Sequence, residues 1–254
     1  MAVSPFAEPA QAGSAAAVSR VAAVIPAWNE AEALGPLLAE LRELDPGVVD
    51  DVLVVLAQST DATAAVARAA GARVVAQARP GYGAACWEGY QAARAAGATL
   101  VVFLDGDGSD PPNAIPQLLA PLARGQADLV LGVRRAEPGR SRAAGAIPWH
   151  ARAGNALVCR LLWWRTGRLV SDLPSMKALG VDRLADLELT EMGYGWTTEM
   201  IAKALTRGWR VHEVAVRSRP RFGGRSKVSG NVRASVRAAY ALVTTALRAS
   251  RRPA

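Results

Sequence analysis

The sequence predicts an α/β fold in which a mostly parallel central sheet is flanked by helices. Short apolar runs alternate with segments of helical periodicity through the first half of the chain, which is the pattern of strand-helix units. Polar or glycine-rich loops follow four of these runs. The chain has 254 residues and is 51% hydrophobic, enough to bury the core of one large domain.

Five runs are predicted strands because they are short and rich in Val, Leu and Ala. They span residues 21–27, 52–56, 73–77, 99–104 and 128–133. Helices are predicted between them, over residues 34–44, from the Ser59-Thr60-Asp61 capping sequence to residue 70, over 84–96 and over 112–124. Asp45-Pro46-Gly47 ends the first helix and Pro112 opens the last. This alternation favours parallel strands covered on both faces.

The alternation is lost after Val133. Residues 137–148 are rich in Gly, Pro and Arg and are predicted to form a mobile loop, and residues 149–166 a helix. That helix contains Trp163-Trp164 among arginines, a combination found at membrane interfaces and also in core-packing helices.

These patterns divide the chain into three predicted segments. They are a disordered leader over 1–19, the main domain over 20–228 and a basic amphipathic C-terminal helix over 229–254. The apolar face of this last helix is expected to lie on a membrane surface or on its own domain. Its residues are Val232, Val236, Tyr240, Val243 and Leu247.

The charge of the chain is unevenly distributed. The net charge is +8, and residues 207–254 hold 12 Lys or Arg against Glu213 alone. Such a segment suits phosphates on a nucleotide, a lipid, a membrane surface or a nucleic acid. No helix-turn-helix, RNA-binding sheet signature or zinc-finger spacing accompanies it, so a nucleic-acid partner is not expected.

Three further features of the sequence predict where in the cell the protein is found. No apolar run approaches the roughly 20 residues that cross a bilayer. The first 20 residues lack a basic start before an apolar stretch, so no secretory signal is expected. Cys86 and Cys159 form no paired motif and are predicted to be buried thiols. We expect a protein of the cytoplasm or of the inner face of the cell membrane.

The acidic loop Asp105-Gly106-Asp107 follows a predicted strand. Two carboxylates separated by one small residue can face a single cation, and such oxygen ligands suit Mg²⁺ or Mn²⁺. Ligands of parallel sheets bind beyond the carboxyl ends of strands, so the loops 26–30, 58–61, 79–83 and 105–110 should converge on one crevice.

Three motifs occur in the order of a known family: Ile25-Pro26-Ala27-Trp28-Asn29-Glu30, Gly81-Tyr82-Gly83-Ala84-Ala85, and Asp105-Gly106-Asp107-Gly108-Ser109-Asp110-Pro111-Pro112. From about residue 21 to 227 the chain resembles the dolichyl-phosphate mannose synthase branch of family 2 glycosyltransferases, which have the GT-A type fold. The resemblance implies an inverting, metal-dependent transfer of a sugar from a GDP-mannose or UDP-glucose type of donor to polyprenyl phosphate. A hydroxyl of a soluble acceptor and a degenerate, non-catalytic nucleotide-sugar binder are the alternatives.

The resemblance also implies contacts with the donor. Pro26, Ala27 and Glu30 would hold the nucleotide, and Asp105 and Asp107 the metal and the leaving diphosphate. The turn Gly81-Tyr82-Gly83 would let backbone amides approach a ligand, with Tyr82 as a stacking face. The family also has a basic loop that closes over phosphates, and a segment of this chain is similar to it. That segment contains Arg219, Arg221, Arg225, Ser226 and Lys227.

Two further acidic residues are candidates for the acceptor side. Asp172 lies in a segment similar to the acceptor loop of the family and is the candidate general base for a hydroxyl acceptor, and Glu199 lies in a second acidic segment. A polyprenyl phosphate is already an anion and needs no strong base. Helix capping or ion pairing is the alternative role of Asp172 and Glu199.

The sequence departs from the family after the second strand. The aspartate expected to hold the nucleobase is replaced by Leu56, followed by Ala57-Gln58-Ser59-Thr60-Asp61. Losing a charge-assisted hydrogen bond of about 1.5 to 3 kcal/mol weakens binding by a factor of roughly 10 to 100. Gln58 or Asp61 is expected to substitute in part.

Overall fold

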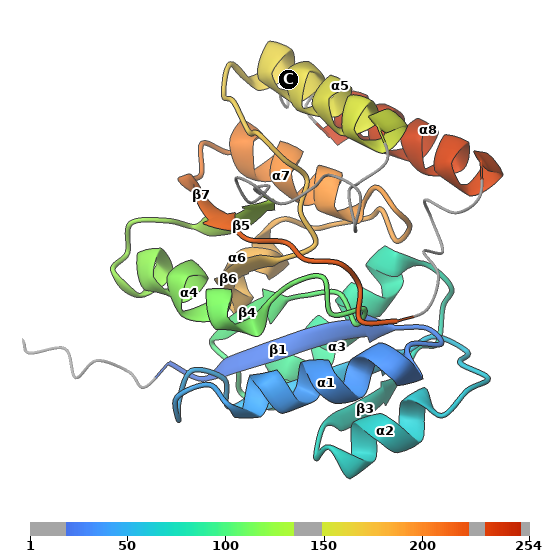
Figure 1. The fold of residues 1–254 in the computed structure, drawn as a ribbon. Coiled ribbons are helices and arrows are strands. Elements are labelled where there is room, and N and C mark those ends of the chain that lie inside the picture. Colours follow the sequence, from blue (N-terminus) through green and yellow to red (C-terminus); the bar gives the residue numbers. More distant parts are fainter. Residues whose placement is uncertain (1–18, 135–148, 224–231, 250–254) are drawn as a thin grey trace, which may run out of the picture.

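The computed structural model describes residues 19–134, 149–223 and 232–249. A seven-stranded sheet of order β3-β2-β1-β4-β6-β5-β7 runs through the molecule (Figure 1). Its strands are β1 (Val21–Ala27), β2 (Asp51–Leu56), β3 (Arg73–Ala76), β4 (Leu100–Phe103), β5 (Leu129–Arg134), β6 (Lys177–Gly180) and β7 (Val211–Val216). The helices are α1 (Ala31–Arg42), α2 (Thr63–Ala69), α3 (Tyr82–Ala95), α4 (Ile115–Ala123), α5 (Trp149–Thr166), α6 (Val181–Asp186), α7 (Trp196–Thr206) and α8 (Val232–Ala249), with a 3-10 turn at Pro112–Ala114.

The predicted mostly parallel sheet is confirmed. Strand β1 pairs in parallel with β2 and β4, β2 with β3, and β5 with β7. Strand β6 is antiparallel to both of its neighbours, β4 and β5. Since β1 to β4 all run the same way, the loops at their carboxyl ends lie at one edge of the sheet.

The sheet is covered on both faces, which explains the continuous apolar runs. Val21, Ala23 and Ile25 of β1 pack with α1, α2 and α4, while Ala22 and Val24 pack with α3 and α7 on the other face. Successive strand residues point to opposite faces, so a strand between two helical layers must be apolar throughout.

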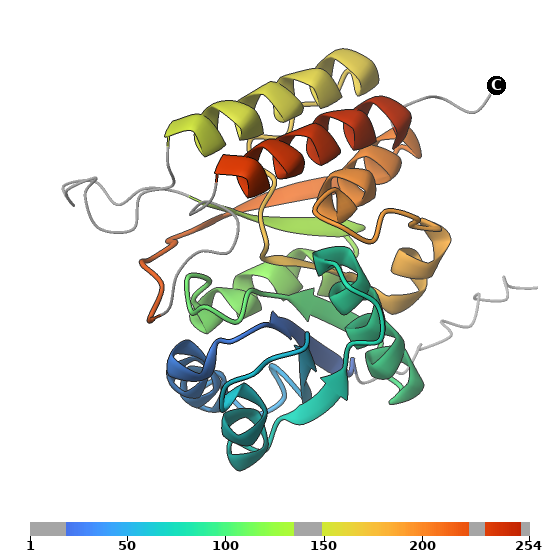
Figure 2. The same ribbon diagram turned by 90° about the vertical axis from the view of Figure 1, so that its right-hand side faces the viewer.

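Helices α5 and α8 form an outer layer on α7, side by side in both views (Figures 1 and 2). The Arg165 guanidinium donates a hydrogen bond to the Leu247 carbonyl at 3.0 Å, which joins the two helices. Helix α8 lies within the predicted C-terminal segment and places Ala246 in the core, as expected of an amphipathic helix.

Two predicted segments lie outside the described residues: residues 1–18 of the leader and the loop 137–148. Within the described ranges, no helix has the length and hydrophobicity of a membrane span. Cys86 and Cys159 are buried free thiols.

Candidate active site

The loops after β1 and β2 are tied together by hydrogen bonds. The Asn29 amide donates to the Ser59 hydroxyl at 3.0 Å, and the Thr60 amide returns a bond to the Asn29 side-chain oxygen at 2.8 Å. Asn29 has a φ of 52°, a left-handed conformation that Asn tolerates better than most residues. The Asp61 carboxylate accepts the Ala31 amide at 3.2 Å and so satisfies the N-terminus of α1 from the neighbouring loop.

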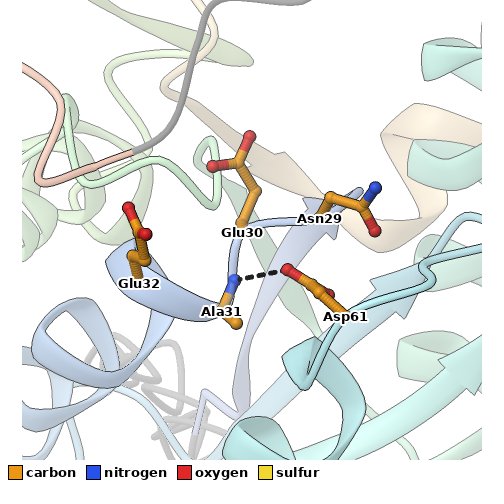
Figure 3. A pocket seen from close by; sticks show the side chains of 5 residues that line it. All are labelled: Asn29, Glu30, Ala31, Glu32 and Asp61. Atoms are coloured by element: carbon orange, nitrogen blue, oxygen red, sulfur yellow. Dashed lines mark hydrogen bonds between the residues drawn. The ribbon is translucent and has the colours of Figure 1, made fainter.

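A small pocket of about 140 Å³ lies at this N-terminus (Figure 3). Its lining is rich in oxygen, which suits hydroxyl donors such as those of a ribose. Burial opposes ionisation of Asp61, but hydrogen bonds from Thr63 and Ala31 hold its pKa below the usual value. The pocket is lined by Asn29, Glu30, Ala31, Glu32 and Asp61.

The acidic loop after β4 is folded against the end of β1. The Asp105 amide donates to the Asp110 carboxylate at 3.1 Å, and the Ser109 amide to the Asp107 carboxylate at 2.8 Å. A Cβ at Gly106 would lie 3.0 Å from the Pro26 carbonyl oxygen, so the loop approaches β1 too closely for a larger residue to fit easily.

Negative charge is concentrated in this loop. Burial, and then the charges of Asp110 and Asp107, raise the pKa of Asp105 to about 7. Burial also raises the pKa of Asp110. The positive charge of Lys177 and a hydrogen bond from Tyr82 act in the opposite direction on Asp105. A bound cation would relieve the remaining repulsion.

The oxygen ligands of the loop fit a divalent cation. Across the described ranges, no group of three or more His, Cys, Asp or Glu side chains is arranged to hold a metal by itself. Mg²⁺ characteristically takes one or two carboxylates and completes its shell with substrate phosphates and water. Asp105 and Asp107 match this requirement.

The segment after β7 crosses the acidic loop. Arg221 pairs with the Asp107 carboxylate at 3.0 Å and the Glu30 carboxylate at 2.8 Å. The Arg219 guanidinium donates to the Gly108 carbonyl at 2.7 Å, and the Phe222 amide to the Asp107 carbonyl at 3.0 Å. Two arginines of the predicted basic loop therefore lie beside the acidic loop. The predicted role of the basic loop over phosphates stays a prediction, and Arg225, Ser226 and Lys227 lie outside the described residues.

The glycine turn serves the packing of the protein itself. The Gly83 amide donates to the Gly193 carbonyl at 3.1 Å and the Ala84 amide to the Met192 carbonyl at 2.8 Å. A Cβ on Gly83 would come within 2.7 Å of the Trp196 Cβ. These contacts occupy the Gly83 and Ala84 amides. The predicted ligand contacts of Gly81, Tyr82 and Gly83 stay predictions.

Asp172 is buried, 5% exposed, and is held by a bidentate ion pair with Arg134 at 2.9 and 2.7 Å. It also accepts hydrogen bonds from the amides of Arg134 and Leu173 and from the Asn155 side chain. Burial favours its neutral form, but the bonds and charge of Arg134 lower its pKa. This geometry gives Asp172 a positioning role; its role as a base remains a prediction.

Glu199 is held in a similar way on α7. It accepts the Thr190 and Glu191 amides at 2.9 and 2.8 Å and pairs with Lys203 at 2.8 Å. Burial opposes ionisation, yet Lys203 and the Glu191 amide lower its pKa. Glu199 thereby orders the chain segment that packs on the glycine turn, and its predicted catalytic role is untested.

Lys177 is a residue of this region that the sequence patterns did not single out as a site residue. It is fully buried, and its ammonium donates to the Ser175 and Pro174 carbonyls at 2.6 and 3.2 Å. It also lies 5.4 to 6.0 Å from the ring centroids of Trp196, Phe103 and Tyr82. The sequence signal for its burial was its position between apolar residues, with Met176 before it and Ala178-Leu179 after it.

Leu56 ends β2 beside Ala27 of β1 and is half-buried there. Of the two expected substitutes, Asp61 is engaged at the N-terminus of α1 and Gln58 is exposed. The contact predicted between Gln58 and the nucleotide remains untested.

The sequence model described as glycosyl transferase family 2 matches residues 22–164, more than half of the chain. The chain belongs to glycosyl transferase family 2.

Two relatives and one solved structure illustrate the match. An uncharacterised glycosyltransferase of Mycobacterium tuberculosis (strain ATCC 25618 / H37Rv) is 39% identical over 216 residues, covering 85% of this chain and 93% of the relative. An undecaprenyl-phosphate mannosyltransferase of Micrococcus luteus is 31% identical over 227 residues, covering 84% and 89%. The crystal structure of glucosyl-3-phosphoglycerate synthase from Mycobacterium tuberculosis with Mn²⁺, UDP and phosphoglyceric acid has a TM-score of 0.72 at 25% identity, covering 93% and 80%.

These matches confirm the GT-A fold, the glycosyltransferase class and the resemblance to the polyprenyl-phosphate branch.

Proposed function

We propose that the protein transfers a hexose, with inversion, from a nucleotide-diphosphate sugar to a polyprenyl phosphate, assisted by Mg²⁺ or Mn²⁺. The observation that carries the proposal is the geometry of the acidic loop, which follows β4, packs against the Pro26 carbonyl of β1 at Gly106 and has Arg221 on the Asp107 carboxylate at 3.0 Å. The loop lies at the carboxyl edge of the parallel strands, where ligands of such sheets bind.

The donor diphosphate would lie between the acidic loop and Arg221. Asp105 and Asp107 would hold the divalent cation, which when bound supplies positive charge opposite the leaving diphosphate. The Arg221 guanidinium, now on Asp107 and Glu30, has N–H groups that can bind phosphate oxygens at the same place. Glu30 and the pocket at the N-terminus of α1 would take the ribose or the base, with Pro26 and Ala27 as the backbone beside them.

The hydrogen bonds and ion pairs of Asp172 and Glu199 favour a phosphate acceptor over a hydroxyl acceptor. A hydroxyl acceptor needs a base within hydrogen-bond reach that has an oxygen free to take the proton. The pKa values of Asp172 and Glu199 are lowered, and their oxygens accept several hydrogen bonds each. A phosphate oxygen is already ionised and can attack the anomeric carbon without proton removal. The name of the Micrococcus luteus relative supports the same acceptor class.

A non-catalytic nucleotide-sugar binder is a second candidate, motivated by Leu56. A leucine cannot accept a hydrogen bond from a nucleobase, and the nearby Asp61 is already engaged. Retention of both carboxylates in the acidic loop favours the enzyme.

The test offers radiolabelled GDP-mannose and UDP-glucose to the purified chain with Mn²⁺ or Mg²⁺ and undecaprenyl phosphate. We expect sugar in the lipid phase with the wild type and not with Asp107→Ala. Transfer only to a soluble hydroxyl acceptor would contradict the proposed acceptor. Donor binding with neither transfer nor hydrolysis would favour the non-catalytic candidate.

A further inference from the structure

The outer layer, formed by α5, α8 and residues 167–171, exposes much of the apolar surface of the protein. Of the nine large hydrophobic side chains that are exposed in the described residues, six lie on it. They are Leu157, Trp163, Trp164, Leu169, Tyr240 and Leu247. Trp164 is 70% and Leu169 74% exposed, values that exclude a core-packing role for these two side chains.

The exposed positions of α5 form a stripe along the helix. Ala153, Leu157, Arg160 and Trp164 are exposed at intervals of three or four residues, so they share one face. The opposite face carries Val158, Cys159 and Leu162, which are buried in the core. A helix with one apolar face in the core and a second one in solvent has an unpartnered surface.

The charges of this layer have one sign. The sequences of α5 and α8 contain no Asp or Glu, and Arg152, Arg160 and Arg168 are exposed on and just beyond α5. The Arg165 guanidinium lies 5.5 Å from the centre of the Trp164 ring. The Glu213 carboxylate of β7 binds Ser171 at the edge of the layer, but the exposed charged side chains of α5 beside Trp164 and Leu157 are arginines. Tryptophan and leucine among arginines are typical of surfaces that lie in the interface of an anionic membrane.

A groove on the same layer adds to this surface. It has a volume of about 760 Å³ and is lined by Ala153, Ala156, Leu157, Cys159, Arg160, Trp163, Leu169 and Ser171. Ser171 of this lining is next to Asp172 in the chain, and the Asn155 side chain of α5 donates to Asp172 at 2.9 Å. The layer is therefore connected to the acceptor side of the active site.

A second copy of the chain fits this surface poorly. A two-fold contact through α5 would place the arginines of one copy near those of the other, with no carboxylate from either helix between them. A bilayer containing anionic phospholipid offers both negative headgroups for the arginines and an apolar boundary for Trp and Leu.

We propose that the outer layer docks the enzyme on a membrane that contains anionic phospholipid, with Trp163, Trp164 and Leu169 entering the headgroup region. The inference rests on the surface alone and goes beyond the proposed reaction, because it applies to bilayers that hold no acceptor. With a polyprenyl-phosphate acceptor, the same docking would bring the active site to its substrate.

The experiment measures sedimentation of the full chain with vesicles of phosphatidylcholine alone or with phosphatidylglycerol, both without polyprenyl phosphate. We expect binding only to the anionic vesicles and weakening at high salt, because salt screens surface charge. One basic residue near an anionic surface raises the partition coefficient about fivefold. Arg160→Glu removes one positive charge and adds a negative one, so it should lower the partition coefficient by roughly two such factors, about 25-fold. Trp164→Ala should lower it several-fold.

Two matched controls carry the same changes at other places. Arg68→Glu reverses an exposed arginine on α2, and Trp28→Ala removes a tryptophan that is 50% exposed beside the donor site. Both should bind vesicles as the wild type does, and thermal melting verifies that all four variants are folded. Equal binding by all four, no binding to anionic vesicles, or a change of oligomeric state in Arg160→Glu without loss of vesicle binding would overturn the proposal. Vesicle binding without sugar transfer would contradict the proposed reaction and leave the docking surface intact.

Discussion

The acidic loop and the buried carboxylates of the second half of the chain are held in opposite ways. Asp105 lies among other carboxylates, which together with burial raise its pKa to about 7. Asp172 and Glu199 are also buried, but Arg134 and Lys203 pair with them and their pKa values are lowered. The crowding of Asp105 by Asp107 and Asp110 favours a cation from outside, although Asp107 also pairs with Arg221 at 3.0 Å, whereas Asp172 and Glu199 already have their counter-charges and hold neighbouring segments in place.

The largest effect is expected at the acidic loop. Asp107→Ala should lower kcat/KM for sugar transfer about a thousandfold, or about 4 kcal/mol, because it removes a group that supports the leaving diphosphate. Asp182→Asn, an exposed acid on α6, is the matched control and should leave the rate within about a factor of two. Equal rates for both variants would contradict a role of Asp107 in sugar transfer.

Asp172→Ala should act mainly on stability. It leaves the partly buried Arg134 without its carboxylate, so the free energy of unfolding in urea should fall by about 3 kcal/mol. The double variant Arg134→Met/Asp172→Leu should regain most of this loss, because neither charge remains unpaired. A folded, stable Asp172→Asn without any transfer activity would instead favour the predicted role of Asp172 as a base.

The two regions should also respond to pH with opposite signs. In metal-free protein the pKa of Asp105 is about 7, against roughly 3.9 for an unfolded Asp, so stability should fall as pH rises between these values. The lowered pKa of Asp172 contributes stability that is complete above the unfolded value and is lost as pH falls through the folded value. Melting temperatures across pH test this: Asp105→Asn should flatten the first slope and Asp172→Asn the second.

The smallest effect concerns the nucleobase. Leu56→Asp restores a carboxylate at the end of β2 beside Ala27, and should tighten binding of the preferred nucleoside diphosphate about tenfold, or about 1.4 kcal/mol. Leu56→Ala removes the same side chain without adding a carboxylate and should not tighten binding. Titration calorimetry with UDP and GDP would identify the preferred base, and unchanged affinity would mean that the base binds elsewhere.

The first half of the fold was predictable because its signals are local. β1 has its predicted bounds, and the helices of this half begin and end within a few residues of theirs, since apolar runs and breaking residues mark both ends. Strand β6 was not predicted, because four residues that include Lys177 carry no strand signal. Its antiparallel place depends on pairing such as Phe103 with Lys177, which the sequence alone does not reveal.

The residues of the candidate site also fall into those that local sequence patterns could identify and those that they could not. Asp105, Asp107, Glu30 and Arg221 were identifiable from strand-end and basic motifs, and in the structure Arg221 joins Glu30 and Asp107 by ion pairs. The pairing of Asp172 with Arg134 and the packing of Gly83 on Trp196 depend on partners 38 and 113 residues away. Contacts at such separations are set by the tertiary fold and have no local sequence pattern.

The central claim, that the acidic loop binds a donor diphosphate through a divalent cation, is tested most directly by calorimetric titration of UDP and GDP into wild type and Asp107→Ala, each with Mn²⁺ and with EDTA. We predict that the wild type binds one of the two nucleotides with Mn²⁺ and much more weakly with EDTA, and that Asp107→Ala binds weakly in both. Nucleotide binding that is equally tight with EDTA, or that survives Asp107→Ala unchanged, would contradict it.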